Sequence, residues 1–249
     1  MKTIGVIPAR YASTRFPAKV LAKIDGKPLI QHVWEKATQS QALDEVLIAC
    51  DHEEVLKAAQ GFKARAVLTD PHHPSGSDRI AEAIKDLKVD IVVNIQGDEP
   101  FIDTRTIDAL TVLLKQDTKI MMGTVIKEIT DDADFQNPHV VKCVVDDQGY
   151  ALYFSRSPIP YHRNKQASLG IRNYKHLGLY AYRKDFLMEF TQWPKGALES
   201  AEELEQLRAL EHGVKIKTTK TSYESIAVDT PQDLEKAIAW YEKLKSIKT

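Results

Sequence analysis

Apolar runs of strand length alternate with amphipathic stretches through the first half of the chain. The runs cover residues 4–7, 46–50, 64–68 and 90–95, and each is typical of a parallel strand buried on both faces. Apolar side chains recur at helical spacing over residues 29–37, 53–60, 77–87 and 104–114. The alternation predicts an α/β fold of Rossmann-like type, with a mostly parallel central sheet and helices on both faces.

The alternation of strands and helices breaks after a further strand at residues 121–126. Residues 140–145 and 150–155 are strand-like and flank the turn at 146–149, which is typical of a β-hairpin. We therefore expect residues 130–175 to form a β-rich insertion that carries a dimer contact. No repeat or linker interrupts the sequence, so we expect one domain over residues 1–249.

The last third of the chain returns to the earlier pattern. Strands are expected at residues 176–182 and 214–218, with a helix at 184–190. Residues 200–212 are expected to form one helix with three leucines facing inward and Glu202, Glu205 and Gln206 on other faces. Thr230 and Pro231 are a typical start for the final helix.

Charge and cysteine content exclude several classes of protein. The 249 residues carry a net charge of −1, which argues against a nucleic-acid or membrane-surface partner. No apolar run approaches the roughly 20 residues that cross a bilayer, and the N-terminus lacks a signal-peptide pattern. Cys50 and Cys143 lie far apart in apolar strands, which suits reduced packing residues. We expect a cytoplasmic protein without membrane insertion.

A basic loop follows the first strand. It presents Arg10, Arg15 and Lys19 among small residues and two prolines. Ligands of open α/β sheets bind beyond the carboxyl ends of the strands, where this loop lies. Arginine offers a planar fork of donors and lysine a compact charge, so the loop suits a polyphosphate. A solvated basic loop is the alternative, which the preceding strand and the lack of acidic residues disfavour.

Two further loops carry polar residues at strand ends. Ser75 and Gly76 precede a helix whose N-terminus favours anions, although Ser77 or Asp78 could simply cap that helix. Asp98 follows the strand at 90–95 and is placed to meet a divalent cation and phosphates, with an ordinary turn as the alternative. Asp229 is either a turn residue or a second metal carboxylate that meets Asp98 in space.

Seven motifs in order along the chain closely resemble the 3-deoxy-manno-octulosonate cytidylyltransferases, also called CMP-Kdo synthetases. They are PARYASTR at 8–15, SGSDR at 75–79, QGDEP at 96–100, YALYFSR at 150–156, HLGLY at 176–180, LEQLR at 204–208 and VDTP at 228–231. Each motif alone has low specificity, whereas the ordered set is highly specific and covers nearly the whole chain.

The resemblance implies a homodimeric enzyme that uses Mg²⁺ to join CTP to Kdo, releasing pyrophosphate and giving CMP-Kdo for lipopolysaccharide assembly. It implies a nucleotidyltransferase fold in which Asp98 and Asp229 bind Mg²⁺ and act in catalysis with Arg10 and Lys19. The implied nucleotide-binding residues are Ala9, Arg10, Arg15, Lys19, Ser75, Gly76, Arg79 and Gln96. The implied sugar-binding residues are Gln96, Arg156, His176, Tyr180, Glu205 and Gln206.

The chemistry of the residues agrees with this resemblance. A sugar acid that attacks a nucleoside triphosphate brings two anions together, so cations and a metal must neutralise charge first. Two rival functions keep the same fold. One is a cytidylyltransferase for 8-amino-Kdo or a sialic acid, or a uridylyltransferase for another sugar. The spacing does not decide between Kdo and 8-amino-Kdo, because a single pocket contact can read one exocyclic group. The other is a non-catalytic nucleotide-binding protein, which would not need two metal carboxylates.

Overall fold

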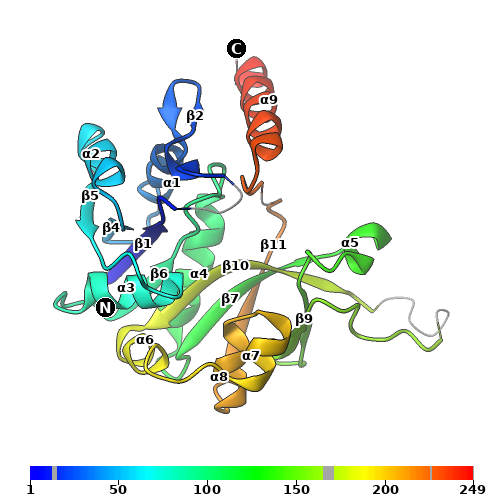
Figure 1. Cartoon of the computed structure of the whole chain (residues 1–249). Coiled ribbons are helices and arrows are strands. Elements are labelled where there is room, and N and C mark those ends of the chain that lie inside the picture. Colours follow the sequence, from blue (N-terminus) through cyan, green and yellow to red (C-terminus); the bar gives the residue numbers. More distant parts are fainter. Residues whose placement is uncertain (13–15, 165–170, 225, 249) are drawn as a thin grey trace.

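A computed structural model describes residues 1–12, 16–164, 171–224 and 226–248 of the chain. Within these ranges, a mixed sheet has the order β11-β7-β10-β6-β1-β4-β5, with β8 paired to β10 and β9 paired to β8 (Figure 1). Its strands are β1 (Thr3–Ala9), β4 (Glu45–Cys50), β5 (Arg65–Leu68), β6 (Ile91–Asn94), β7 (Met122–Glu128), β8 (Lys142–Val145), β9 (Ala151–Ser155), β10 (Tyr174–Arg183) and β11 (Ile216–Thr221). The predicted α/β class is confirmed.

Helices connect the strands and cover the sheet on both faces. They are α1 (Leu29–Ala37), α2 (Glu53–Gly61), α3 (Gly76–Ile84), α4 (Thr104–Gln116), α5 (Asp132–Gln136), α6 (Lys184–Phe190), α7 (Ala197–Glu202), α8 (Gln206–Glu211) and α9 (Pro231–Lys248). A small hairpin of β2 (Lys23–Ile24) and β3 (Lys27–Pro28) precedes α1, and a 3₁₀ turn covers Lys19–Leu21. None of the described helices combines the length and apolar character that crossing a membrane requires.

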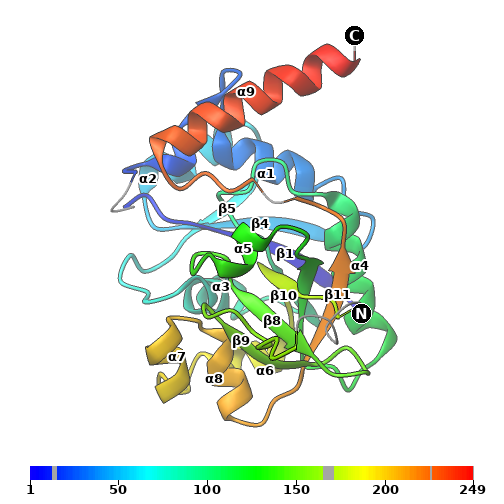
Figure 2. The same ribbon diagram turned by 90° about the vertical axis from the view of Figure 1, so that its right-hand side faces the viewer.

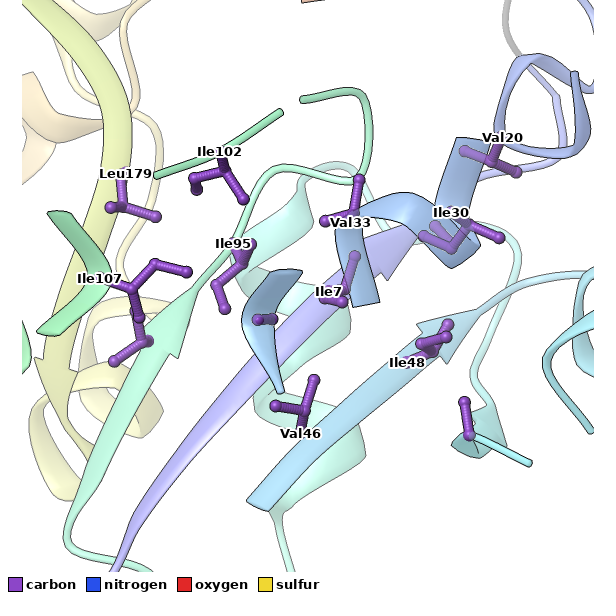
Figure 3. Close-up of a cluster of buried hydrophobic side chains, with 14 of the residues drawn as sticks. Ile7, Val20, Ile30, Val33, Val46, Ile48, Ile95, Ile102, Ile107 and Leu179 are labelled. Atoms are coloured by element: carbon purple, nitrogen blue, oxygen red, sulfur yellow. The ribbon is translucent and has the colours of Figure 1, made fainter. Parts of the chain in front are cut away.

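The strands bury alternate side chains on opposite faces of the sheet, as the pleat requires. On β1, Ile7 packs into a cluster with α1 and α4, and Figure 3 shows it beside Ile30, Val33 and Ile95. Ile4 instead packs into the cluster on the other face, which α3, α6 and α8 complete. This two-sided burial explains why the strands read as continuous apolar runs in the sequence.

Strand β10 runs antiparallel through the middle of the sheet. It pairs with β6 on one side and with β7 on the other, whereas β1, β4, β5 and β6 are parallel to one another. The register with β7 shifts between His176 and Tyr180, where Gly178 has a φ of 69°. A bulge of this kind redirects the side chains that flank it. The bulge therefore determines the directions in which the His176 and Tyr180 side chains of the HLGLY motif point.

The segment at 130–175 contains the predicted hairpin, since β8 pairs antiparallel with β9. Strand β8 also pairs with β10, so the hairpin continues the main sheet. The short helix α5 was not predicted. It has five residues and begins where the Asp131 side chain accepts a hydrogen bond from the backbone N–H of Ala133.

The expectation of one helix over residues 200–212 was wrong. The chain forms α7 and α8, separated by Glu203, whose φ of 52° lies in the left-handed region. Arg208 then folds back and makes two hydrogen bonds of 2.7 Å to the carboxylate of Glu199 across the break. The break also changes which residues are buried, because Gln206, expected on another face from the leucines, is only 3% exposed.

Helix α9 begins as predicted. The hydroxyl of Thr230 accepts from the backbone N–H of Asp233, and the Asp233 carboxylate accepts from the backbone N–H of Thr230. Within α9, Ala237 is fully buried, whereas Ile238 is 38% exposed. Both views of the molecule place α9 at the opposite end from α7 and α8 (Figures 1 and 2).

Candidate active site

A cavity of about 400 Å³ opens beyond the carboxyl ends of β1 and β6, where ligands of open α/β sheets bind. Its lining joins the basic loop, the loop before α3, the loop after β6 and the segment before α9. The lining residues are Pro8, Arg10, Ala12, Lys19, Val20, Gly76, Gln96, Gly97, Asp98 and Asp229. The structure thus brings together residues from four separate motifs of the sequence.

Lys19 connects the two aspartates that the sequence left far apart. Its ammonium lies 2.8 Å from Oδ2 of Asp98 and 2.7 Å from Oδ1 of Asp229. Burial opposes the charge on Lys19, but attraction to both carboxylates outweighs it and raises the pKa of Lys19 above its ordinary value. The two carboxylates therefore face one position occupied by a positive charge.

Backbone contacts fix both aspartates. The backbone N–H of Val228 donates to the carbonyl oxygen of Asp98 at 2.9 Å, which holds the segment before α9 against the loop after β6. A Cβ atom at Gly97 would lie 2.8 Å from the carbonyl oxygen of Pro8, so only glycine lets this loop approach β1 so closely. The loop that carries Asp98 is thereby held against the end of β1.

The donor set fits Mg²⁺. Among the described residues, no group of three or more histidine, cysteine or acidic side chains is arranged to hold a metal. Mg²⁺ is usually bound by only one or two carboxylates, with water and substrate phosphates completing its octahedral shell. Asp98 and Asp229, already converging on one cation, supply that number of ligands.

Of the other basic residues in the loop, Arg10 lies at the cavity. Its side chain is exposed, lines the cavity and donates to the carbonyl oxygen of His73 at 3.0 Å. It thereby joins the basic loop to the loop before α3. Arg15, the third predicted cation, lies outside the described residues.

The loop before α3 ends in a helix cap, but at a different residue from the one expected. Ser75, rather than Ser77 or Asp78, caps α3 by accepting from the backbone N–H of Asp78 at 3.1 Å, and Gly76 lines the cavity. Ala9, at the end of β1, is fully buried. Ala9, Ser75 and Gly76 keep their assignment to the nucleotide as a prediction.

Arg79 is not placed on the cavity surface. Its side chain is fully buried, and it donates to the hydroxyl of Thr69 at 2.6 Å and to Oδ2 of Asp51 at 3.2 Å. The other oxygen of Asp51 accepts from the backbone N–H of Tyr11 at 2.8 Å. Arg79 and Asp51 thus hold the basic loop to β4 and β5, a role that sequence reasoning missed although Asp51 directly follows a predicted strand.

Gln96 connects the cavity to the bulge in β10. It lines the cavity, and its Nε2 donates to the carbonyl oxygen of Gly178 at 2.8 Å. The HLGLY motif on β10 is therefore attached to the nucleotide side of the site.

His176 is held in one protonation state. The hydroxyl of Thr124 donates to the carbonyl oxygen of Leu179 at 2.8 Å, so it accepts from Nε2–H of His176 at 2.9 Å. Burial lowers the pKa of His176 to about 3. The imidazole is neutral at pH 7, and its Nδ1 carries the lone pair that can accept a hydrogen bond. Tyr180 is 8% exposed, with its ring centroid 5.1 Å from that of His176.

The chain matches one protein family throughout. The family model described as Cytidylyltransferase matches residues 4–216. The 3-deoxy-manno-octulosonate cytidylyltransferase of Geobacter sulfurreducens is 48% identical, with 98% of this chain and 100% of the relative covered. A similar relative from Thermodesulfovibrio yellowstonii is 49% identical over 95% of this chain and 97% of its own length. The chain belongs to the 3-deoxy-manno-octulosonate cytidylyltransferase family.

Solved structures agree with this membership. A CMP:2-keto-3-deoxy-manno-octonic acid synthetase complexed with CTP superimposes with a TM-score of 0.93 and 42% identity, covering 98% of this chain and 99% of that one. A 4-diphosphocytidyl-2C-methyl-D-erythritol synthase from Anaerococcus prevotii has a TM-score of 0.64 at 14% identity and shares the fold alone.

Within this cytidylyltransferase, Arg156 lies at the end of β9 against α7. Its Nε donates to the carbonyl oxygen of Glu202 at 2.7 Å, and its backbone N–H donates to the Glu202 carboxylate at 2.9 Å. Lys142, fully buried, donates to three carbonyl oxygens, including that of Arg156 at 2.6 Å. The sequence offers no signal for this role of Lys142, because its position in β8 reads as an ordinary polar strand residue.

Glu205 and Gln206 lie where the chain enters α8. Oε2 of Glu205 accepts from the hydroxyl of Ser77 at 2.6 Å, and burial raises the pKa of this carboxyl above its ordinary value. Gln206 Nε2 is buried without a hydrogen-bond partner in the structure. Both side chains are therefore packed into the protein at the start of α8, and their assignment to the sugar stays a prediction.

Proposed function

We propose that this chain transfers the cytidylyl group from CTP to Kdo, giving CMP-Kdo for lipopolysaccharide assembly and pyrophosphate, with Mg²⁺ as cofactor. The observation that carries the proposal is the convergence of Asp98 and Asp229 on one positive charge inside a cavity that the basic loop also lines. Relatives named 3-deoxy-manno-octulosonate cytidylyltransferases match nearly the whole chain, which supports CTP and Kdo as the substrates.

Charge neutralisation is the main task of the site. CTP and a sugar acid repel each other, so the protein must supply positive charge before the sugar oxygen can approach the α-phosphorus. Arg10 and Lys19 both line the cavity. The raised pKa of Lys19 keeps its ammonium charged at neutral pH. We assign both residues, together with Arg15, to the triphosphate.

Asp98 and Asp229 are the residues that would hold Mg²⁺. The ion, when bound, would neutralise phosphate charge and lower the pKa of the attacking sugar hydroxyl. The remaining work belongs to the chain. The loop after β6 keeps Asp98 against β1, the contact from Val228 keeps Asp229 beside it, and Lys19 compensates the charge of both carboxylates.

The sugar acid is assigned to the side of the cavity that faces β10 and α8. Gln96 lines the cavity and touches the bulge that carries His176 and Tyr180. Because His176 is neutral, it can accept from a sugar hydroxyl through Nδ1 but cannot pair with the sugar carboxylate. The cation that suits the carboxylate is Arg156, and Glu205 and Gln206 are assigned to the remaining hydroxyl groups.

Pyrophosphate release tests the proposal directly. Purified protein is incubated with CTP and Mg²⁺, and with Kdo, 8-amino-Kdo, a sialic acid or no sugar. We expect release with Kdo, none without sugar, and loss of activity when EDTA removes the metal. Turnover of Kdo hundreds of times slower than that of a rival sugar would overturn the assignment of Kdo as the substrate. Absence of release with every sugar from folded, metal-replete protein would favour a nucleotide-binding protein without activity.

We also propose that the enzyme is a homodimer that meets through the 130–175 segment and works in the cytoplasm. Leu152, Tyr161 and Ile171 of this segment are 62%, 85% and 53% exposed. Large apolar side chains at such exposure within one segment favour a protein–protein contact. The free, buried Cys50 and Cys143 agree with a reducing compartment.

A further inference from the structure

One hydrogen bond joins the two sides of the site across 128 positions of sequence. The hydroxyl of Ser77 donates to Oε2 of Glu205 at 2.6 Å, and Ser77 is 1% exposed. Ser77 belongs to the first turn of α3 and follows Gly76, which lines the cavity. Glu205 directly precedes α8 and is adjacent to the buried Gln206. The bond therefore connects the helix assigned to CTP with the helix assigned to the sugar acid.

Strand β10 approaches the same point. Tyr182 is fully buried, and its neutral hydroxyl lies close to Ser77, Asn94 and Glu205. Oδ1 of Asn94 is buried without a hydrogen-bond partner in the structure. Ser77 thus lies where α3, β10 and the start of α8 meet in a buried polar cluster.

The basic residue nearest Glu205 is engaged elsewhere. Arg208 makes hydrogen bonds of 2.7 Å to both oxygens of Glu199, whereas its distance to Oε1 of Glu205 is 4.0 Å. A largely buried carboxylate needs donors, because leaving it unsatisfied costs more than a typical hydrogen bond contributes. Ser77 supplies a short hydrogen bond, and Ser75 of the same turn also lies within hydrogen-bonding reach of Glu205, so this turn of α3 contributes strongly to where Glu205 points.

We propose that Ser77 is a positioning residue that couples the binding of the two substrates, because its hydroxyl ties the CTP-side turn of α3 to Glu205 on the sugar side. The proposal rests on the proposed function, in which Glu205 contacts the sugar acid. When CTP binds, it orders the first turn of α3 and so fixes the Ser77 hydroxyl. The fixed hydroxyl holds the Glu205 carboxylate in the orientation that contacts the sugar. Without the hydroxyl, binding of CTP no longer orients Glu205 for the sugar.

Initial rates over a grid of CTP and Kdo concentrations, at fixed Mg²⁺, test this coupling. In the wild-type enzyme we expect saturating CTP to lower the apparent dissociation constant of Kdo by at least about fivefold. In Ser77→Ala we expect that factor to fall to near 1 and KM for Kdo to rise by about tenfold, the range for loss of a hydrogen bond to a charged group. KM for CTP measured at low Kdo should change little.

Ser200→Ala is the matched control. The Ser200 hydroxyl donates to the carbonyl oxygen of Gly196 within its own helix, so its removal should leave the coupling factor unchanged. Ser77→Cys keeps the volume but donates weakly, and it should reproduce the loss if Ser77→Ala is too unstable to assay. Thermal melting of each variant checks that it is folded.

Each outcome decides the proposal. Loss of the coupling factor in folded Ser77→Ala or Ser77→Cys supports it. A lower kcat with an unchanged coupling factor, or a wild-type enzyme without coupling, overturns it. A wild-type protein that does not form CMP-Kdo overturns the proposed function instead, and that result is visible before any variant is made.

Discussion

At the scale of single residues, the convergence of Asp98 and Asp229 is the feature that matters most for chemistry. Lys19 is 79 positions from Asp98 and 210 from Asp229, yet its ammonium contacts both. Each carboxylate could have been an ordinary turn residue, and only the folded chain distinguishes the two cases. The basic charge between them indicates a site built to hold a cation.

We predict that Asp98→Asn and Asp229→Asn each reduce kcat by about a hundredfold or more, because charge in the transition state loses its compensation. Steady-state rates of pyrophosphate release measure the effect, and circular dichroism checks folding. Asp147→Asn, on an exposed turn, is the control and should retain activity. Near-normal turnover by either site variant would contradict the assignment of these carboxylates to Mg²⁺.

His176 gives a prediction for stability against pH. Its pKa is about 3 in the folded protein, against 6.5 for the free side chain. Between these values the unfolded state binds a proton that the folded state does not, so stability falls as the pH falls from 6.5 toward 3. The expected slope is up to about 1.4 kcal/mol per pH unit from this residue alone.

Urea unfolding at pH 7, 6, 5 and 4 measures this slope. The difference between wild type and His176→Gln isolates the contribution of His176 from that of the carboxylates. His72→Gln serves as the control, because the His72 side chain is 89% exposed. Equal slopes for wild type and His176→Gln would show that the imidazole titrates normally in the folded protein.

At the residue scale, the sequence placed several candidate residues at strand ends, and the structure brings them to one cavity. Arg10, Lys19, Gln96 and Asp98 directly follow predicted strands or their loops, and they line one cavity. Sequence reasoning did not find Ser77 as a partner of Glu205, or Asp51 as a partner of Arg79, because these pairs form between elements whose relative placement no local pattern specifies.

At the scale of elements, apolar runs located most of the strands because burial on both faces removes polar alternation. The same signal could not show that β10 runs antiparallel between β6 and β7, since pairing partners are absent from a local pattern. The break between α7 and α8 was missed for a different reason. Glutamate rarely adopts the left-handed conformation, so Glu203 gives no sequence signal for a helix end.

We predict that Glu203→Gly stabilises the protein by roughly 0.5–1 kcal/mol. Glycine adopts a positive φ without the steric cost that glutamate carries, and this gain exceeds the larger conformational entropy that glycine loses on folding. Chemical denaturation measures the change. Glu235→Gly, at an exposed position within α9, is the control and should cost about 1 kcal/mol. A Glu203→Gly variant destabilised as much as the control would show that strain at this φ is unimportant.

At the scale of the whole molecule, the segment at 130–175 is the surface through which we propose that the protein dimerises, because Leu152, Tyr161 and Ile171 are exposed there. We predict that Tyr161→Glu weakens the dimer by at least about tenfold, because a charge in an apolar contact is costly to desolvate. Analytical ultracentrifugation over a dilution series measures the dissociation constant. Trp240→Glu, at a residue of α9 that is 42% exposed, is the control and should leave it unchanged. Weakening of the dimer by Trp240→Glu but not by Tyr161→Glu would show that the interface lies at α9 instead.

The place of β10 has a consequence for synthesis in the cell. Its neighbours β6 and β7 leave the ribosome well before it, and until residues 174–183 emerge their facing edges have no strand between them. Unpaired apolar edges of this kind are prone to join other chains. A nascent enzyme therefore carries these unpaired edges until strand β10 has left the ribosome and inserted between them.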